Sequence, residues 1–123
     1  MNKQIQCVED LVVFTKAYEV SLELHEASQS WPKHEQFRGI ADQIRRASKG
    51  ICANLAEGFG KQAYSKAEFK RYIAMAIGSA DEIRVWLSYA KDLSYMSAKD
   101  AQIYRDRYQT IAKMLTGLHK SWA

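Results

Sequence analysis

The sequence has little of what marks membrane, secreted or disulfide-stabilised proteins. Its 123 residues include two cysteines and one proline, and no apolar run exceeds a few residues. A membrane-spanning helix needs about 20 apolar residues in succession, so none is expected. Cys7 and Cys52 form no CxxC pair, and the N-terminus lacks the apolar core of a signal peptide. We therefore expect a cytoplasmic protein with two free thiols.

Catalytic and metal-binding patterns are also missing. The three histidines, His25, His34 and His119, lie far apart, and the sequence contains no HExxH, Glu-x-x-His or GxSxG motif. A di-metal site inside a helical bundle would need Glu-x-x-His pairs on facing helices. We therefore expect no enzyme, no metal site and no cofactor.

The glycine-rich stretch NLAEGFGK, residues 54–61, could be a phosphate loop or the end of a helix. A phosphate loop would follow a strand or continue as Gly-Lys-Ser/Thr, whereas here a helical pattern precedes it and Gln62 follows Lys61. The helix-end interpretation is therefore favoured. It predicts that Gly58 takes a left-handed conformation and that Gly60 lets the chain reverse.

Helical periodicity runs through the chain, and strand-like alternation is nearly absent. Ser65 with Glu68 forms a capping-box pattern, and Ser97 with Asp100 marks another helix start. The fold class predicted is all-α: one domain over residues 1–123, an antiparallel up-down-up-down four-helix bundle. The expected helices cover about residues 8–28, 33–57, 65–92 and 97–122.

Three of these helices have one clear apolar stripe that should face the core. The stripe of the last helix alternates intervals of four and three, which is a heptad seam. The expected core residues are Phe37, Ile40, Ile44, Ser48, Ile51 and Leu55; then Phe69, Ile73, Ala76, Ala80, Ile83, Leu87 and Ala90; then Tyr104, Tyr108, Ile111, Leu115, Leu118 and Trp122.

The first helix has two apolar stripes on nearly opposite sides, and the third carries large apolar residues away from its core stripe. These residues could simply widen one core. The favoured alternative is that they pack on a neighbouring subunit, because an exposed apolar patch is a liability for a monomer. One stripe of the first helix is Leu11, Phe14, Tyr18 and Leu22. The predicted subunit interface is Val13, Ala17, Val20, Leu24, Met75, Trp86 and Tyr89.

Basic charge gathers in the middle of the chain. Residues 1–37 carry a net charge of −3, residues 38–71 carry +5 and residues 72–123 carry +2. This segment is either a solvated charged face or a surface that contacts phosphates, with Phe59 and Tyr64 placed to stack on unpaired bases. The candidate nucleic-acid contacts are Arg38, Arg45, Lys49, Lys61, Lys66, Lys70 and Arg71.

A further stripe along the second helix holds Arg46, Gly50, Ala53, Asn54 and Glu57. Its small residues would let another helix approach closely. A negative charge at the C-terminal end of a helix is unfavourable by up to about 1 kcal/mol. Glu57 is therefore either solvated, paired with a lysine, or held by a partner, and we predict a polar contact from Asn54 and Glu57 to another helix.

Five short motifs occur in order along residues 31–87. They are Trp31-Pro32-Lys33 with Glu35, DQIRRA from Asp42 to Ala47, NLAEG from Asn54 to Gly58, Ser65 with Phe69, and Ala76, Gly78 and Ser79 with Glu82. In these motifs the stretch resembles the four-helix bundle proteins encoded by intervening sequences of bacterial 23S ribosomal RNA genes. The motif residues expected to serve structure or polar contacts are Arg46, Asn54, Glu57, Gly58, Gly78, Ser79 and Glu82.

The resemblance implies a cytoplasmic bundle that assembles as a ring, with a homopentamer favoured, and no established enzymatic activity. The accessory proteins of diversity-generating retroelements are similar in fold, form pentamers, bind nucleic acid through basic surfaces and assist a reverse transcriptase. We therefore predict a non-enzymatic oligomer that binds RNA or DNA, with structured RNA favoured, and with a reverse transcriptase or other protein as a further candidate partner. The alternative is a protein-binding scaffold with no nucleic-acid role.

Overall fold

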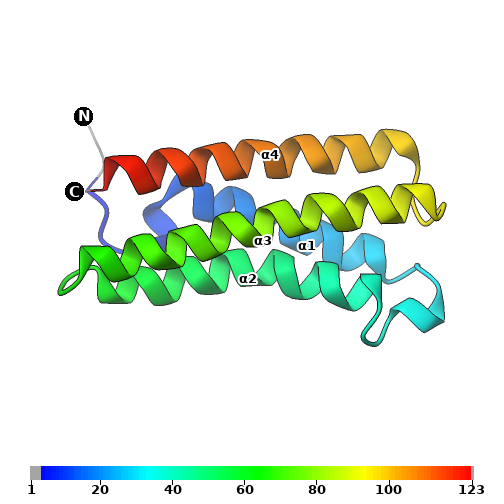
Figure 1. Ribbon diagram of the computed structural model, residues 1–123, viewed down its shortest axis with the longest axis horizontal. Coiled ribbons are helices and arrows are strands. Elements are labelled where there is room, and N and C mark those ends of the chain that lie inside the picture. Colours follow the sequence, from blue (N-terminus) through cyan, green and yellow to red (C-terminus); the bar gives the residue numbers. More distant parts are fainter. Residues whose placement is uncertain (1–3, 123) are drawn as a thin grey trace.

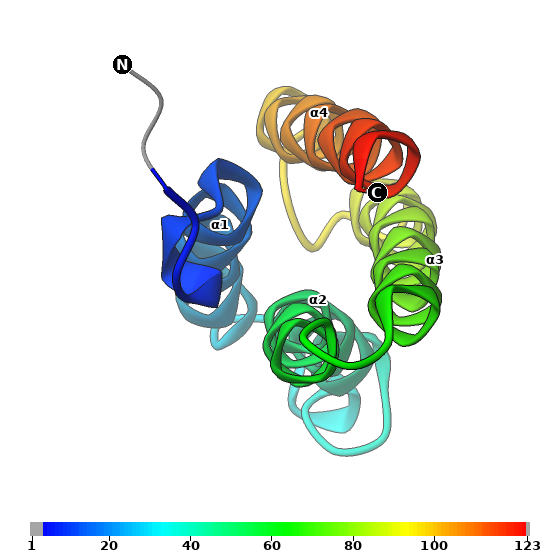
Figure 2. The ribbon, with the colours of Figure 1, turned by 90° about the vertical axis from the view of Figure 1, so that its left-hand side faces the viewer.

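Four helices pack side by side along one long axis (Figure 1). The computed structural model describes residues 4–122, which are helical with short connections and contain no strand, so the predicted all-α class is confirmed. Seen end-on, each helix lies beside its sequence neighbours, α3 lies across the bundle from α1, and α4 completes the ring beside α1 (Figure 2). The helices are α1 (Val12–Ser28), α2 (Ile40–Lys61), α3 (Lys66–Asp92) and α4 (Ala98–Ser121), with the 3-10 turns η1 (Val8–Asp10) and η2 (Lys33–Glu35).

The predicted starts of α3 and α4 are confirmed. The Ser65 hydroxyl accepts a hydrogen bond from the Glu68 amide at 3.1 Å, and the Ser97 hydroxyl accepts one from the Asp100 amide at 3.0 Å. Each hydroxyl satisfies one of the amide groups that the first turn of a helix leaves without a backbone partner.

The predicted start of the second helix at residue 33 is wrong. Residues Lys33–Glu35 form only η2, and the chain then bends until α2 begins at Ile40. The bend has a physical cause in Glu35, whose Oε1 accepts a hydrogen bond from the Ile40 amide at 3.0 Å. A Cβ on Gly39 would come within 2.8 Å of the Glu35 carbonyl oxygen, so this turn requires glycine. Phe37 therefore lies outside α2 and is 74% exposed, not in the core as predicted.

The predicted end of the second helix is wrong as well. Gly58 and Gly60 lie inside α2, which continues to Lys61, and no glycine among the described residues has a positive φ. Gly58 is instead the point where α2 and α3 come closest. A Cβ there would lie 2.5 Å from the Cβ of Tyr72 and 3.2 Å from Cδ1 of Phe69. The glycine is needed for helix contact and not for a turn.

The core of the bundle follows the remaining stripes closely. All seven residues predicted for the third helix are fully buried, from Phe69 to Ala90. Of the stripe predicted on α2, Ile44, Ser48, Ile51 and Leu55 are buried, whereas Ile40 is half-buried. Of the stripe on α4, Tyr108, Ile111 and Leu115 are buried, and half-buried Tyr104, Leu118 and Trp122 pack against the same core.

The stripe of α1 predicted to form a subunit interface lies in the core. Val13, Ala17, Val20 and Leu24 are at most 4% exposed and belong to the core, so they cannot form a subunit interface. The buried face of α1 also includes the small residue Ser21. On the other stripe, Leu11 is buried and Phe14 packs against the core, whereas Tyr18 and Leu22 turn outward and are about half exposed.

No helix among residues 4–122 combines the length and apolar character that crossing a bilayer would require.

Substituting Gly58 tests the close approach of α2 and α3. We expect Gly58→Ala to lower the free energy of unfolding by about 1–3 kcal/mol, because the added methyl overpacks the contact with Tyr72. Gly60→Ala is the matched control in the same helix, because nothing lies within 4 Å of its added Cβ. That control should raise stability by up to about 1 kcal/mol through helix propensity alone. Urea denaturation of both variants checks this, and equal stability changes would contradict the close approach.

Candidate functional site

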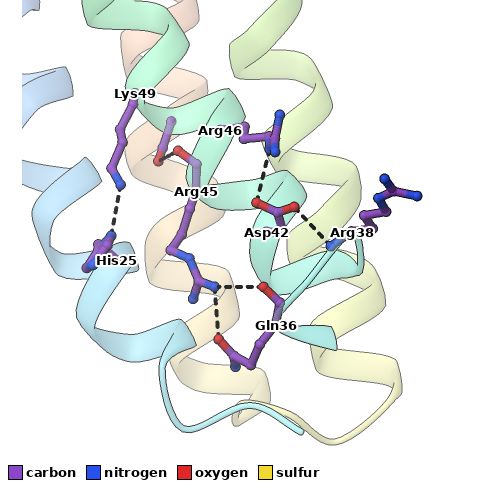
Figure 3. Close-up of polar contacts among 8 residues, drawn as sticks. His25, Gln36, Arg38, Asp42, Arg45, Arg46 and Lys49 are labelled. Atoms are coloured by element: carbon purple, nitrogen blue, oxygen red, sulfur yellow. Dashed lines mark hydrogen bonds and ion pairs between the residues drawn. The ribbon is translucent and has the colours of Figure 1, made fainter. Parts of the chain in front are cut away.

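Arg45 is held inside the protein and is not a free cation. Its Nη1 donates to the Ser28 hydroxyl at 2.8 Å, and its Nη2 donates to Oε1 of Gln36 at 2.8 Å. Gln36 in turn donates to the carbonyl oxygens of Ser28 and Trp31 at 2.8 and 2.9 Å. Figure 3 shows the guanidinium turned toward Gln36. The residue ties α2 to the end of α1 and its loop. Its role as a nucleic-acid contact stays a prediction.

Glu35 links three parts of the chain at the same end of the bundle. Besides its bond to the Ile40 amide, its Oε2 accepts a hydrogen bond from the Tyr95 hydroxyl at 2.7 Å. The bonds from Tyr95 and from the Ile40 amide together hold the pKa of Glu35 below its usual value. The ring of Tyr95 also lies 5.9 Å from that of the buried Trp31. The Trp-Pro-Lys-x-Glu motif therefore joins the α1–α2 and α3–α4 connections.

Two other predicted basic contacts on this side are more accessible. The Arg38 side chain is exposed and points away from its neighbours (Figure 3), over the ring of Phe37. Its backbone has a φ of 65°, which is uncommon for a residue other than glycine, and its amide donates to Asp42 at 2.9 Å. Lys49 is exposed on α2, where its Nζ lies 3.0 Å from Nδ1 of His25 on α1.

The remaining predicted basic residues surround the connection from α2 to α3. Lys66 is exposed, and Lys61 and Lys70 are half-buried. Arg71 is exposed but engaged, because its Nε and Nη2 donate to the two carboxylate oxygens of Glu68 at 3.0 and 3.2 Å. Lys66 and Lys70 make no hydrogen bond or ion pair with any residue from 4 to 122. They are the most available cations of the predicted set.

The two aromatic side chains predicted to stack on bases have different environments. Phe59 packs edge-on against Phe69 and Trp122, with centroid distances of 5.7 and 6.1 Å, so it is partly buried against the core. Tyr64 is 77% exposed beside the basic connection. Tyr64 is therefore the more accessible of the two for stacking on a base.

The stripe of small residues on α2 does meet another helix. A Cβ on Gly50 would lie 3.7 Å from the Ser79 hydroxyl of α3. Ala53 and Glu57 are exposed and Asn54 is half-buried. Within residues 4–122, neither Asn54 nor Glu57 has a side-chain hydrogen bond or ion pair, so their predicted polar contact does not lie inside the protomer.

The other motif residues divide between local structure and the surface. Arg46 donates to Asp42 at 3.0 Å, and this hydrogen bond helps to lower the pKa of Asp42 (Figure 3). Glu82 accepts a hydrogen bond from the indole of Trp86 at 2.9 Å. Gly78 is exposed, with nothing within 4 Å of an added Cβ.

The predicted interface residues on α3 lie at the surface. Met75 and Tyr89 are exposed, and half-buried Trp86 lies with its ring 5.9 Å from that of Tyr89. Val85, about half exposed, adds to this apolar surface. Together with Tyr18 and Leu22 of α1, these residues present apolar side chains on two different helices of the protomer.

The half-buried thiol of Cys52 is unreactive, and the described part of the chain holds no metal cluster. Burial raises the pKa of Cys52 to about 11, which keeps its thiol protonated and weakly nucleophilic at neutral pH. Among residues 4–122, no three His, Cys, Asp or Glu side chains gather closely enough to hold a metal ion.

The residues that sequence reasoning missed are the partners of Arg45 and Glu35. Ser28, Gln36 and Tyr95 lie at helix ends and in connections, where helical periodicity carries no information. The one available signal was the Trp-Pro-Lys-x-Glu motif, which placed Glu35 among residues of interest without naming its partners.

Comparisons with known proteins agree with this architecture. A family model described as 23S rRNA-intervening sequence protein matches residues 9–117. A crystal structure of a protein of unknown function from the S23 ribosomal protein family of Bacteroides thetaiotaomicron VPI-5482 is similar, with a TM-score of 0.79 and 24% identity. That match covers 89% of this chain and 96% of the other. A comparison with curated proteins found no match.

The Glu35 contacts predict a specific pH dependence. Because the pKa of Glu35 is lowered in the folded state, its stabilising contribution is present above the unfolded pKa, near 4.5, and is lost as the pH falls below that value. We expect Glu35→Gln to cost about 1–2 kcal/mol at pH 7 and less at pH 3. Thermal unfolding of both proteins across this range measures the gap.

Tyr95→Phe is the matched variant, because it keeps the carboxylate and removes its strongest hydrogen bond. The stability gap between Tyr95→Phe and wild type should also narrow below pH 4.5. A gap that stays constant with pH for both variants would contradict the assigned role of Glu35.

Proposed function

The chain belongs to the 23S rRNA-intervening sequence protein family, and from that premise we propose that it is a non-enzymatic homo-oligomer that binds nucleic acid, with structured RNA favoured. The observation that carries the proposal is the set of cations that the fold leaves free. Lys66 and Lys70 lie at the start of α3 without an ion-pair partner among residues 4–122, and the Arg38 side chain is exposed. Such side chains can replace the counterions of a phosphate backbone.

Assembly of several copies of the chain would increase the number of these phosphate contacts. We propose that the antiparallel up-down-up-down bundle is the subunit of a ring, with five copies favoured by the family resemblance. Support comes from Tyr18 and Leu22 on α1 and from Val85 and Tyr89 on α3, all about half exposed. Water-exposed apolar side chains on two helices favour burial against another copy. In a ring each subunit would present the same cations, so weak phosphate contacts would add.

Asn54 and Glu57 fit this arrangement as a contact between subunits. Both lie on the outer side of α2, beside the close contact of Gly50 with Ser79. A neighbouring subunit that covered this surface would supply the hydrogen-bond partners that they lack within the protomer. Glu57→Gln should then weaken the assembly without altering the fold of the subunit.

A protein-binding scaffold is the second candidate. The exposed apolar side chains of α1 and α3 are the observation that favours it, because a protein partner, such as a reverse transcriptase, could cover them in place of another copy. In that case the basic surface would serve solubility alone. A cytoplasmic location suits both candidates, since Cys7 and Cys52 are free thiols.

Light scattering tests the assembly. We expect a mass of about five times the chain's 14.1 kDa at neutral pH. Tyr89→Glu should reduce this mass, because a charge would be buried without a partner at the subunit contact. The control is Tyr64→Glu, which alters an exposed tyrosine outside both apolar surfaces and should leave the mass unchanged. A wild-type monomer would contradict the proposed ring.

Salt-dependent RNA binding tests the ligand. We expect the affinity for a structured ribosomal RNA fragment to fall steeply as salt rises. The double variant Lys66→Glu with Lys70→Glu should bind about tenfold more weakly and lose about two units of the salt slope. The control is Lys16→Glu with Lys33→Glu, two exposed lysines in the acidic N-terminal part of the chain.

Absence of binding at low salt, or a flat salt dependence, would contradict the nucleic-acid role. Capture of one protein partner that survives nuclease treatment, by a wild type that binds no RNA, would support the scaffold.

A further inference from the structure

A groove runs between α3 and α4 on the outside of the bundle. It has two hollows of about 270 and 370 Å³. Arg84 and Asp81 of α3 line both hollows, whereas Arg105 lines the first and Lys113 lines the second, both from α4. The sequence had not singled out these residues, because the C-terminal segment carries only a weak positive charge overall.

The side chains that line the groove carry a net positive charge. It is lined by three cationic side chains and one carboxylate, and the Asp81 carboxylate accepts a single hydrogen bond from Nη1 of Arg84 at 3.3 Å. That ion pair is partly exposed and leaves the other donors of the Arg84 guanidinium unused by the described residues. The Gln109 amide lines the second hollow and adds a further donor.

The groove between α1 and α4 provides a useful contrast. It is lined by Lys16 and Arg107 together with Glu19. Arg107, however, donates through both Nη1 and Nη2 to the Glu23 carboxylate at 2.8 and 2.7 Å. A bidentate pair of this kind consumes the charge and the donor fork of the arginine. Basic residues therefore line both grooves, but only the α3–α4 groove leaves its arginines available.

Arg105 also has a buried hydrogen-bond donor without an acceptor. Its Nε is buried and has no hydrogen-bond partner among residues 4–122, although the side chain as a whole is half-buried. A buried N–H without an acceptor costs free energy, so most such groups in proteins are paired. The other guanidinium donors of Arg105 also have no hydrogen-bond or ion-pair partner among residues 4–122, and the residue lines the first hollow, where an anionic oxygen would be a suitable acceptor.

We propose that the α3–α4 groove binds the phosphates of a nucleic-acid strand, with Arg84, Arg105 and Lys113 as the contacts. This inference rests on the proposed function and gives it a specific site. Arg105 and Lys113 are eight residues apart on α4, which corresponds to about 12 Å along the helix. This spacing suits successive phosphates of one strand, each meeting one of the two side chains. Because the contacts go to the backbone, binding tolerates changes of sequence.

Two sets of variants test the groove. Arg84→Gln with Arg105→Gln should weaken binding of a structured ribosomal RNA fragment about tenfold and reduce the salt slope by about two. Lys16→Gln with Lys33→Gln removes the same charge outside the groove and should change affinity far less. Asp81→Asn should strengthen binding several-fold, because it removes the only carboxylate lining the hollows, whereas structural damage would weaken binding.

The outcomes separate the groove from the function on which it rests. Wild-type RNA binding that is unchanged in the double arginine variant would overturn the groove site and leave the proposed function standing. If the wild type binds no RNA at low salt, the proposed function fails, and NMR titration with tripolyphosphate then tests the groove alone. Shifted Nε–H signals of Arg84 and Arg105 would support an anion site there, and unshifted signals would overturn it.

Discussion

The close approach of α2 and α3 at Gly58 is the contact on which the rest of the bundle depends. A single methyl at this position would collide with Tyr72, so the two helices can lie this close only because residue 58 has no side chain. The same approach sets Phe59 against Phe69 and Trp122, which joins the ends of α2 and α4 to the start of α3. It also fixes the short connection that carries the basic residues around Lys66. A requirement for close packing thus determines where a charged surface is displayed.

The charges of the protein fall into two groups with different consequences. Arg45, Arg71 and Arg107 are engaged by polar partners within the chain. Arg45 and Arg107 join different elements, whereas Arg71 pairs with Glu68 on its own helix. Lys66 and Lys70, by contrast, have no such partner among residues 4–122, and Arg84 and Arg105 retain unused donors in the α3–α4 groove. An arginine that is already paired gains little by meeting a phosphate, because the first partner must be given up. Net charge alone therefore overstates the number of residues that can bind an anion. The residues that can do so are the cations that have no partner, or that keep unused donors, within the fold.

The sequence predicted α3 and α4 well because their apolar residues recur on one face and a serine caps each start. It predicted α2 poorly at both ends. The start depends on a carboxylate, Glu35, that accepts a hydrogen bond from the Ile40 amide, and the end depends on whether Gly58 turns the chain or packs against Tyr72. The helical periodicity of apolar residues gives no information about either contact.

In α1 both stripes are apolar, and the pattern cannot tell which one faces the core. The prediction therefore places Val13, Ala17, Val20 and Leu24 on the wrong side. The same limit applies to the site: Arg45 looked like a surface cation because its partners, Ser28 and Gln36, come from a helix end and a connection.

Photo-cross-linking of a bound ribosomal RNA fragment, followed by mass spectrometry of the linked peptides, would test most directly where the free cations act. If the cations left unpaired by the fold carry binding, cross-links will gather on the connection between α2 and α3 and along the α3–α4 groove. Cross-links concentrated on α1 or around Arg45, with none in those two regions, would contradict this view of the protein.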